Sequence, residues 1–177
     1  MNTISSEYRE IQQQLHKDPN YGVMSVHYAP LVKDLLEKTG AKSLSDYGAG
    51  KQRLKSSLIK LGCSDFQYFP YDPAFPSYGP PTPADLVTCI DVLEHIEPSC
   101  LNSVIEDLYR ITKHFGLFTV HTGPAVKVLS DGRNAHLIQQ NSGWWLQKLS
   151  VYFDVIELQS ISQGFWLLVS PRSSQSE

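Results

Sequence analysis

The sequence predicts an α/β sandwich, in which helices cover both faces of a mainly parallel sheet. Apolar, strand-like runs alternate along the chain with segments whose apolar residues recur at helical spacing. The run DLVTCI, at 85–90, has the continuous apolar character of a parallel strand that is buried on both faces. The final two strand-like runs look like an antiparallel pair that closes the sheet.

Proline and glycine mark the expected ends of several elements. Pro30 suits the first turn of a helix that runs to about Lys38, with Gly40 just past its end, and the preceding segment 21–30 is expected to be a loop. Gly62 is expected to end the next helix. The expected helices span 6–16, 30–38, 51–61, 99–113 and 142–150. The expected strands span 42–47, 65–72, 85–90, 116–122, 152–161 and 164–170.

Length and composition indicate one soluble globular domain. The chain has 177 residues, which is long enough for a substantial core, and it is 41% hydrophobic and 19% charged. We expect an N-terminal helical extension at 1–20, the main domain at 21–170 and a flexible tail at 171–177.

Charge and cysteine content restrict the partners and the compartment. A net charge of −3 argues against nonspecific binding to a nucleic-acid backbone, so no long nucleic acid is expected as a partner. Three cysteines without a CxxC pair indicate neither a zinc ribbon nor a disulfide framework, and favour a cytoplasmic location. The polar N-terminus lacks the apolar core of a signal peptide, and no apolar run approaches the roughly 20 residues that span a bilayer, so no membrane partner is expected. The oligomeric state stays open.

The stretch LSDYGAGKQRL, at 44–54, places two glycines and a lysine after a strand-like run. A phosphate loop requires the pattern GxxxxGK[ST], but Ser45 stands five residues before Gly50, and Gln52 follows the lysine. A dinucleotide fingerprint requires a third glycine where Arg53 stands, and that long side chain would obstruct close packing of helix on strand. A tight strand-to-helix turn without a ligand is a further interpretation.

The segment DYGAG, at 46–50, resembles the first motif of class I S-adenosylmethionine-dependent methyltransferases. The resemblance implies that S-adenosylmethionine is the cofactor and that Asp46 binds its methionine ammonium, directly or through water. It also implies that Gly48 and Gly50 let the backbone approach the cofactor, which a Cβ atom would prevent. The family's fuller pattern has another glycine where Gln52 stands.

Two further segments carry the same resemblance. Asp72 follows the second strand, where the resemblance places an acid that accepts hydrogen bonds from ribose hydroxyls; an Asx turn before Pro73 is the alternative. The segment DLVTCIDVLEHIEP, at 85–98, looks like the fourth-strand segment of these enzymes. The backbone that would then border the methionine end of the cofactor belongs to Ile90, Asp91 and Val92.

The resemblance also predicts a reduced sheet edge. These enzymes usually place a helix and a third strand between the ribose acid and the fourth strand, but only the Pro-rich segment 73–84 stands between Asp72 and Asp85. We therefore expect a Rossmann-like class I methyltransferase sandwich in which that helix and strand are missing. The adenine would lie against the loop at 75–81, with Phe75 or Tyr78 as a stacking partner; packing of these rings over the sheet edge is the alternative.

Asp91, Glu94 and His95 have the spacing i, i+3, i+4, so they share one face if a helical turn starts at Asp91. This segment resembles the Glu-x-x-Glu-His motif of the small-RNA 3′-end 2′-O-methyltransferases and the ubiquinone-pathway O-methyltransferases. The resemblance implies a Mg²⁺ or Mn²⁺ site made of Asp91, Glu94, His95 and His136. In the alternative interpretation, Glu94 and His95 shape the loop through hydrogen bonds and no metal is bound.

The predicted function is transfer of a methyl group to an O or N nucleophile of a small molecule or nucleotide. Glu94, His95 and His136 are the expected catalytic residues; without a metal, His95 or His136 would act as general base. His121 is also expected near the substrate, whereas His16 is assigned no functional role. The alternative function is a catalytically inactive S-adenosylmethionine-binding regulatory protein with the same fold.

Overall fold

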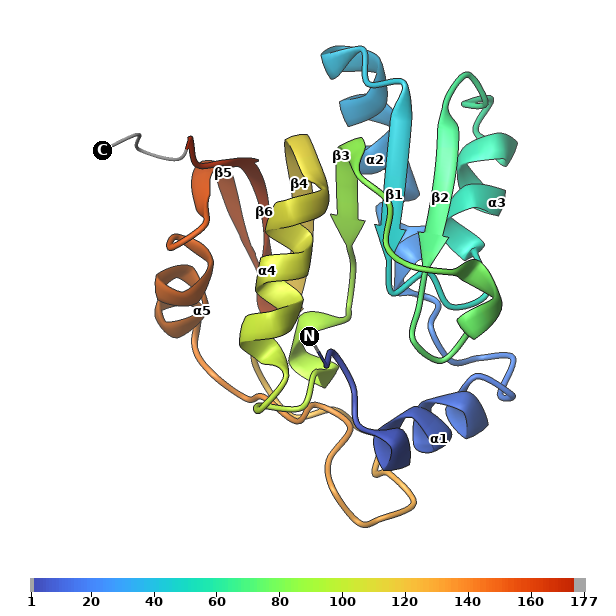
Figure 1. Cartoon of the computed structure of the whole chain (residues 1–177), viewed down its shortest axis with the longest axis vertical. Helices are drawn as coiled ribbons and strands as arrows, with labels where there is room; N and C mark the ends of the chain where they lie inside the picture. Colours follow the sequence, from blue (N-terminus) through green and yellow to red (C-terminus); the bar gives the residue numbers. More distant parts are fainter. Residues whose placement is uncertain (1, 174–177) are drawn as a thin grey trace.

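A computed structural model describes residues 2–173 and contains one six-stranded sheet with helices on both faces (Figure 1). The strands are β1 Ser43–Tyr47, β2 Gln67–Tyr71, β3 Ala84–Cys89, β4 Thr112–His121, β5 Phe153–Ile161 and β6 Gly164–Pro171. The helices are α1 Ser6–Leu15, α2 Met24–Thr39, α3 Arg53–Lys60, α4 Leu101–Ile111 and α5 Ser142–Leu149, with 3₁₀ turns at Pro76–Tyr78 and Leu93–His95. The predicted α/β sandwich is confirmed. Residues 174–177 of the expected tail lie outside the described residues.

The sheet has the strand order β2-β1-β3-β4-β6-β5. The first four strands in this order, β2, β1, β3 and β4, are parallel to one another. Strand β6 runs antiparallel to both β4 and β5. The mostly parallel sheet and its antiparallel C-terminal pair are therefore as predicted.

The sheet edge at β2 is reduced, as the short Pro-rich segment predicts. Between Tyr71 and Ala84 the chain forms only the 3₁₀ turn at Pro76–Tyr78, so β2 has β1 as its single neighbour. Pro70 stands opposite Asp46 within β2. Proline is tolerated there because an edge strand does not need every backbone N–H for pairing.

Helix α2 differs from its prediction. It begins at Met24, inside the segment expected to be a loop, and Pro30 lies within it rather than in its first turn. Pro30 has no N–H to donate to the carbonyl of Val26, which weakens the helix at that point. The helix continues because its apolar face is buried on the sheet; the buried residues are Tyr28, Ala29, Val32, Leu35 and Leu36.

The core lies in two layers, one on each face of the sheet. Helices α2 and α3 pack on one face, where Leu44, Leu54 and Leu86 are fully buried. Helices α4 and α5 pack on the other face around Phe118 and Trp145, which are also fully buried.

Helix α1 lies across the edge of the sheet at which the parallel strands end (Figure 1). Tyr8 of α1, together with Ile4 just before the helix, packs against Leu129 and Ala135 of the long loop between β4 and α5. Ser5, the N-cap of α1, donates through both its backbone N–H and its hydroxyl to Glu97, at 2.7 and 2.8 Å. The N-terminal helix is thereby fixed over the region where parallel α/β sheets bind ligands. Among residues 2–173, no helix has the length and apolar character required to cross a bilayer.

Candidate active site

A cavity of about 470 Å³ lies at the carboxyl ends of β1, β2 and β3, beneath α1. Its volume falls within the range of small-molecule sites, roughly 300–1,000 Å³. One part of its wall is the glycine turn after β1 and another is the segment after β3. The lining residues that matter below are Tyr8, His16, Tyr21, Gly48, Gly50, Asp72, Ile90, Asp91, Val92, His95 and His136.

The glycine turn has a left-handed backbone at both glycines, with φ of 84° at Gly48 and 48° at Gly50. A Cβ atom at Gly48 would stand 2.3 Å from Cγ2 of Val92, a residue that also borders the cavity. Gln52 is left-handed as well, with φ of 54°, at the position where the family pattern has a further glycine. The backbone geometry thus favours glycine at positions 48 and 50, and a glycine in place of Gln52 would relieve strain.

Asp46 lies behind the cavity wall rather than on it. Its side chain accepts hydrogen bonds from the hydroxyls of Tyr68 and Thr88, and it is only 3% exposed. Burial raises the pKa of this carboxyl to about 6. The structure therefore ties Asp46 to neighbouring strands, beneath the turn that it precedes.

Asp72 faces the cavity and also forms the turn after β2. One carboxylate oxygen accepts the Gly50 N–H at 2.9 Å, and the other accepts the Ala74 N–H at 2.8 Å. The side chain is 8% exposed, and burial raises its pKa. The Asx turn and the position for ribose binding are compatible, because each carboxylate oxygen can accept a second hydrogen bond.

Phe75 and Tyr78 stack on each other, with ring centroids 5.3 Å apart and planes 7° apart. The Tyr78 hydroxyl donates to the carbonyl of Gly50 at 2.8 Å, which ties the reduced edge to the glycine turn. Phe75 borders a smaller cavity of about 350 Å³, which shares His16 with the main cavity.

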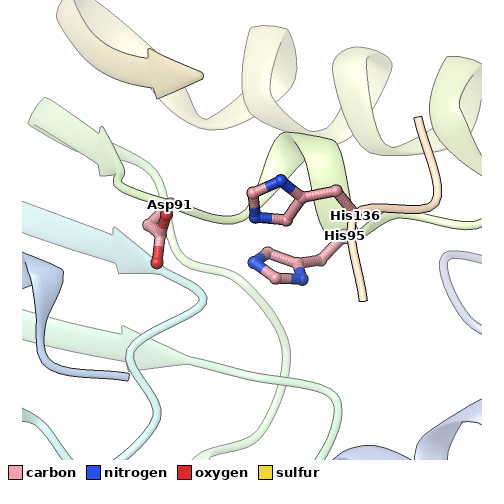
Figure 2. Close-up of side chains that lie close together, drawn as sticks. All are labelled: Asp91, His95 and His136. Carbon is pink, nitrogen blue, oxygen red and sulfur yellow. The ribbon is translucent and has the colours of Figure 1, made fainter. Parts of the chain in front are cut away.

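The side chains of Asp91, His95 and His136 lie close together (Figure 2), each offering a potential ligand atom within 4.8 Å of the others. Nδ1 of His95 lies 2.8 Å from the carbonyl of Ala135, and Nδ1 of His136 lies 2.7 Å from the carbonyl of Gly123. A carbonyl only accepts, so Nδ1 is the protonated nitrogen in the neutral form of each imidazole, and Nε2 then carries the free lone pair. A histidine that binds a metal usually donates its other ring N–H to a carbonyl or carboxylate, as the Nδ1 atoms of His95 and His136 do here.

Glu94 is left out of this cluster. The turn begins at Leu93 and is a 3₁₀ turn, so Glu94 and His95 diverge instead of sharing one face of a helix that starts at Asp91. The Glu94 side chain is fully buried, and one oxygen accepts the N–H of His121 at 2.6 Å. Burial and the nearby Asp91 charge raise its pKa to about 8.

His121 lies beside the cluster but is directed elsewhere. Its ring centroid is 4.7 Å from that of His136, yet its Nε2 faces the side-chain oxygen of Gln163 at 3.0 Å. The cavity also contains His16, which sequence reasoning missed. No local pattern marks it, because it reaches the site only through the folding of α1 back over the sheet.

Comparison with known proteins identifies the fold. No protein-family model and no curated protein matches the chain. The structure resembles the 1,6-didemethyltoxoflavin-N1-methyltransferase of Burkholderia thailandensis, with a TM-score of 0.65, 13% identity, and coverage of 98% of this chain and 93% of that one. It also resembles the N-methyltransferase NodS of Bradyrhizobium japonicum WM9, with a TM-score of 0.58, 10% identity, and coverage of 96% and 100%.

A third similar structure is the magnesium protoporphyrin IX methyltransferase of Synechocystis PCC 6803, with a TM-score of 0.54, 12% identity, and coverage of 94% and 95%. All three were solved with S-adenosylhomocysteine bound. This chain therefore has the fold of the class I S-adenosylmethionine-dependent methyltransferases.

Proposed function

We propose that the protein transfers a methyl group from S-adenosylmethionine to an O or N nucleophile of a small molecule or nucleotide. One observation carries this proposal: the glycine turn with Asp72 and the cluster of Asp91, His95 and His136 line the same cavity. Cofactor and acceptor would therefore meet in one cavity. The residues of α1 that line this cavity restrict access to it, which favours a small acceptor over a long polymer.

The residues on the cavity wall define the proposed cofactor site. Gly48 and Gly50 form the turn on the cavity wall, and the Cβ atoms that they lack would clash with the side chains of Val92 and His16. Asp72 provides a buried acceptor, and the backbone at 90–92 would border the methionine end. Asp46 is proposed to support the turn from behind through Tyr68 and Thr88. When bound, the cofactor supplies an electrophilic methyl group, so the protein mainly has to align the acceptor and receive its proton.

The cluster is proposed to hold a divalent metal. Two neutral imidazoles and one carboxylate fit Mn²⁺ better than Mg²⁺, because Mg²⁺ prefers oxygen ligands alone. A metal there would lower the pKa of an acceptor hydroxyl. Without a metal, the same two Nε2 atoms are general bases for that proton. With or without a metal, Glu94 would act by accepting the backbone N–H of His121 and not as a metal ligand.

Calorimetric titration tests the cofactor. S-adenosylmethionine and S-adenosylhomocysteine should bind, whereas ATP and NAD should not, and failure of both sulfur ligands to bind would refute the proposal. Asp72→Ala should weaken binding of S-adenosylhomocysteine. Asp65→Ala is the matched control, because Asp65 is an exposed acid outside the cavity whose partner is Lys42.

Titration with Mn²⁺ tests the metal. Asp91→Asn and His136→Ala should each weaken Mn²⁺ binding at least tenfold, in line with the loss of a ligand. His121→Ala removes a neighbouring imidazole that is not in the cluster, and should leave the affinity unchanged. Wild-type Mn²⁺ affinity in both Asp91→Asn and His136→Ala would exclude this metal site.

The alternative function is an S-adenosylmethionine-binding protein without turnover. The left-handed Gln52 in place of a glycine and the reduced sheet edge favour it. Cofactor binding without methyl transfer across a broad panel of O and N nucleophiles would support this alternative over the enzyme.

A further inference from the structure

His16 connects the N-terminal helix to the cofactor half of the cavity. It is the C-cap of α1, and its backbone N–H donates to the carbonyl of Gln12 at 3.0 Å. Its ring meets Tyr21 edge-to-face at 5.1 Å and Phe75 edge-to-face at 4.9 Å. Two aromatic neighbours therefore hold the imidazole in one orientation.

The ring of His16 lies directly over Gly50. A Cβ atom at Gly50 would stand 2.9 Å from Cε1 of His16, closer than such atoms pack. The absence of a Cβ atom at Gly50 thus lets the end of α1 pack against the turn that is proposed to carry the cofactor.

Neither ring nitrogen of His16 has a hydrogen-bond partner within the part of the chain that the structure describes. Nε2 lies 3.9 Å from a carboxylate oxygen of Asp72, which is too far for a direct hydrogen bond. One hydroxyl oxygen can span this separation, with hydrogen bonds of about 2.8 Å to each side. Nδ1 is buried and has no hydrogen-bond partner among residues 2–173.

The ring is uncharged near neutral pH, since burial and the nearby positive charge of Lys51 lower the pKa of His16 to about 4. The contact with Asp72 is therefore not an ion pair. A neutral imidazole has one N–H donor and one acceptor nitrogen, which suits hydroxyl groups that both donate and accept.

We propose that His16 binds a ribose hydroxyl of the cofactor together with Asp72. Nε2–H donates to the hydroxyl oxygen, and the hydroxyl donates to Asp72. This inference rests on the proposed function, and it adds a binding residue that comes from outside the sheet. It makes α1, which the Ser5–Glu97 hydrogen bonds fix over the cavity, part of the cofactor site.

The test is calorimetric affinity for S-adenosylhomocysteine and for its 2′-deoxy and 3′-deoxy analogues. His16→Phe keeps a planar ring but no polar atoms, and it should weaken S-adenosylhomocysteine binding about tenfold, the loss of one well-formed hydrogen bond. In the wild type one deoxy analogue should bind about tenfold more weakly than the parent ligand, and this penalty should shrink in His16→Phe. His114→Phe is the control, since His114 is exposed on β4, and should bind as the wild type does.

The outcomes separate this inference from the function on which it rests. If the wild type binds no sulfur ligand, the proposed function fails. If the wild type binds S-adenosylhomocysteine and His16→Phe has the same affinity and the same deoxy penalty, the role of His16 is refuted while the function stands. Equal affinity of the wild type for all three ligands refutes the inference without any variant, so misfolding of His16→Phe does not prevent a decision.

Discussion

The substitution Gly48→Ala would introduce two separate penalties at the glycine turn. The backbone at Gly48 has φ of 84°, a conformation that costs a residue with a Cβ atom about 1–2 kcal/mol. The new methyl would also stand 2.3 Å from Cγ2 and 3.2 Å from Cγ1 of Val92. Overpacking of this kind costs about 1–3 kcal/mol. The free energy of unfolding should therefore fall by about 2–5 kcal/mol.

Gly62→Ala separates the two penalties. Gly62 has φ of 78°, and no atom lies within 4 Å of the place that a new methyl would take, so only the backbone penalty of about 1–2 kcal/mol is expected. Urea denaturation of both variants at one pH measures the difference, provided that the m-values agree. Adding Val92→Ala to Gly48→Ala should recover part of the loss. The reasoning is wrong if the two glycine variants lose equal stability, or if Val92→Ala recovers nothing.

Three further predictions concern the parts that support the cavity. Burial raises the folded-state pKa of Asp46 from 3.8 to about 6, so the folded protein binds this proton more tightly than the unfolded chain, and stability is lost as pH rises through this window. The stability lost between pH 4 and 7 through this group should be about 2.4 kcal/mol, and Asp46→Asn should remove this pH dependence in urea denaturation; an unchanged pH slope would contradict the assignment. Gln52→Gly should raise the free energy of unfolding by about 1 kcal/mol by relieving a left-handed backbone, while Gln52→Ala, which keeps the Cβ atom, should give no gain. Ser5→Ala removes the N-cap of α1 and a hydrogen bond to Glu97, and should lower the hydrogen-exchange protection of α1. Asn141→Ala is the control: it removes the N-cap of α5 at a similar expected cost of about 1 kcal/mol, and should leave the protection of α1 unchanged.

The fold was predictable because its signals are local. Apolar periodicity predicted a helix at 99–113, and α4 lies there with its apolar face buried; the buried residues are Leu101, Val104, Ile105, Leu108 and Ile111. The short segment after Asp72 left no room for another strand, and none is found between Tyr71 and Ala84. Pro30 misled the prediction of α2, since a burial pattern can sustain a helix through one missing hydrogen bond.

The site was predictable only in part. Asp91, His95 and His136 meet, but the left-handed backbone at Asp91 and the 3₁₀ turn after it direct Glu94 into the core instead. Helical spacing carries no information about such a turn. His16 could not be found from sequence either, because its contact with Gly50 joins two segments through the packing of a separate helix.

The proline of the outermost parallel strand limits how copies of the protein can associate. Gln67 donates its N–H toward the β1 side, so by alternation the nitrogen of Pro70 faces away from the sheet. An incoming strand from another molecule would meet five residues, one of which has no proton to offer. An exposed edge strand is ordinarily a template for pairing with another chain. The β2 edge is a poor template because it is short and contains a proline.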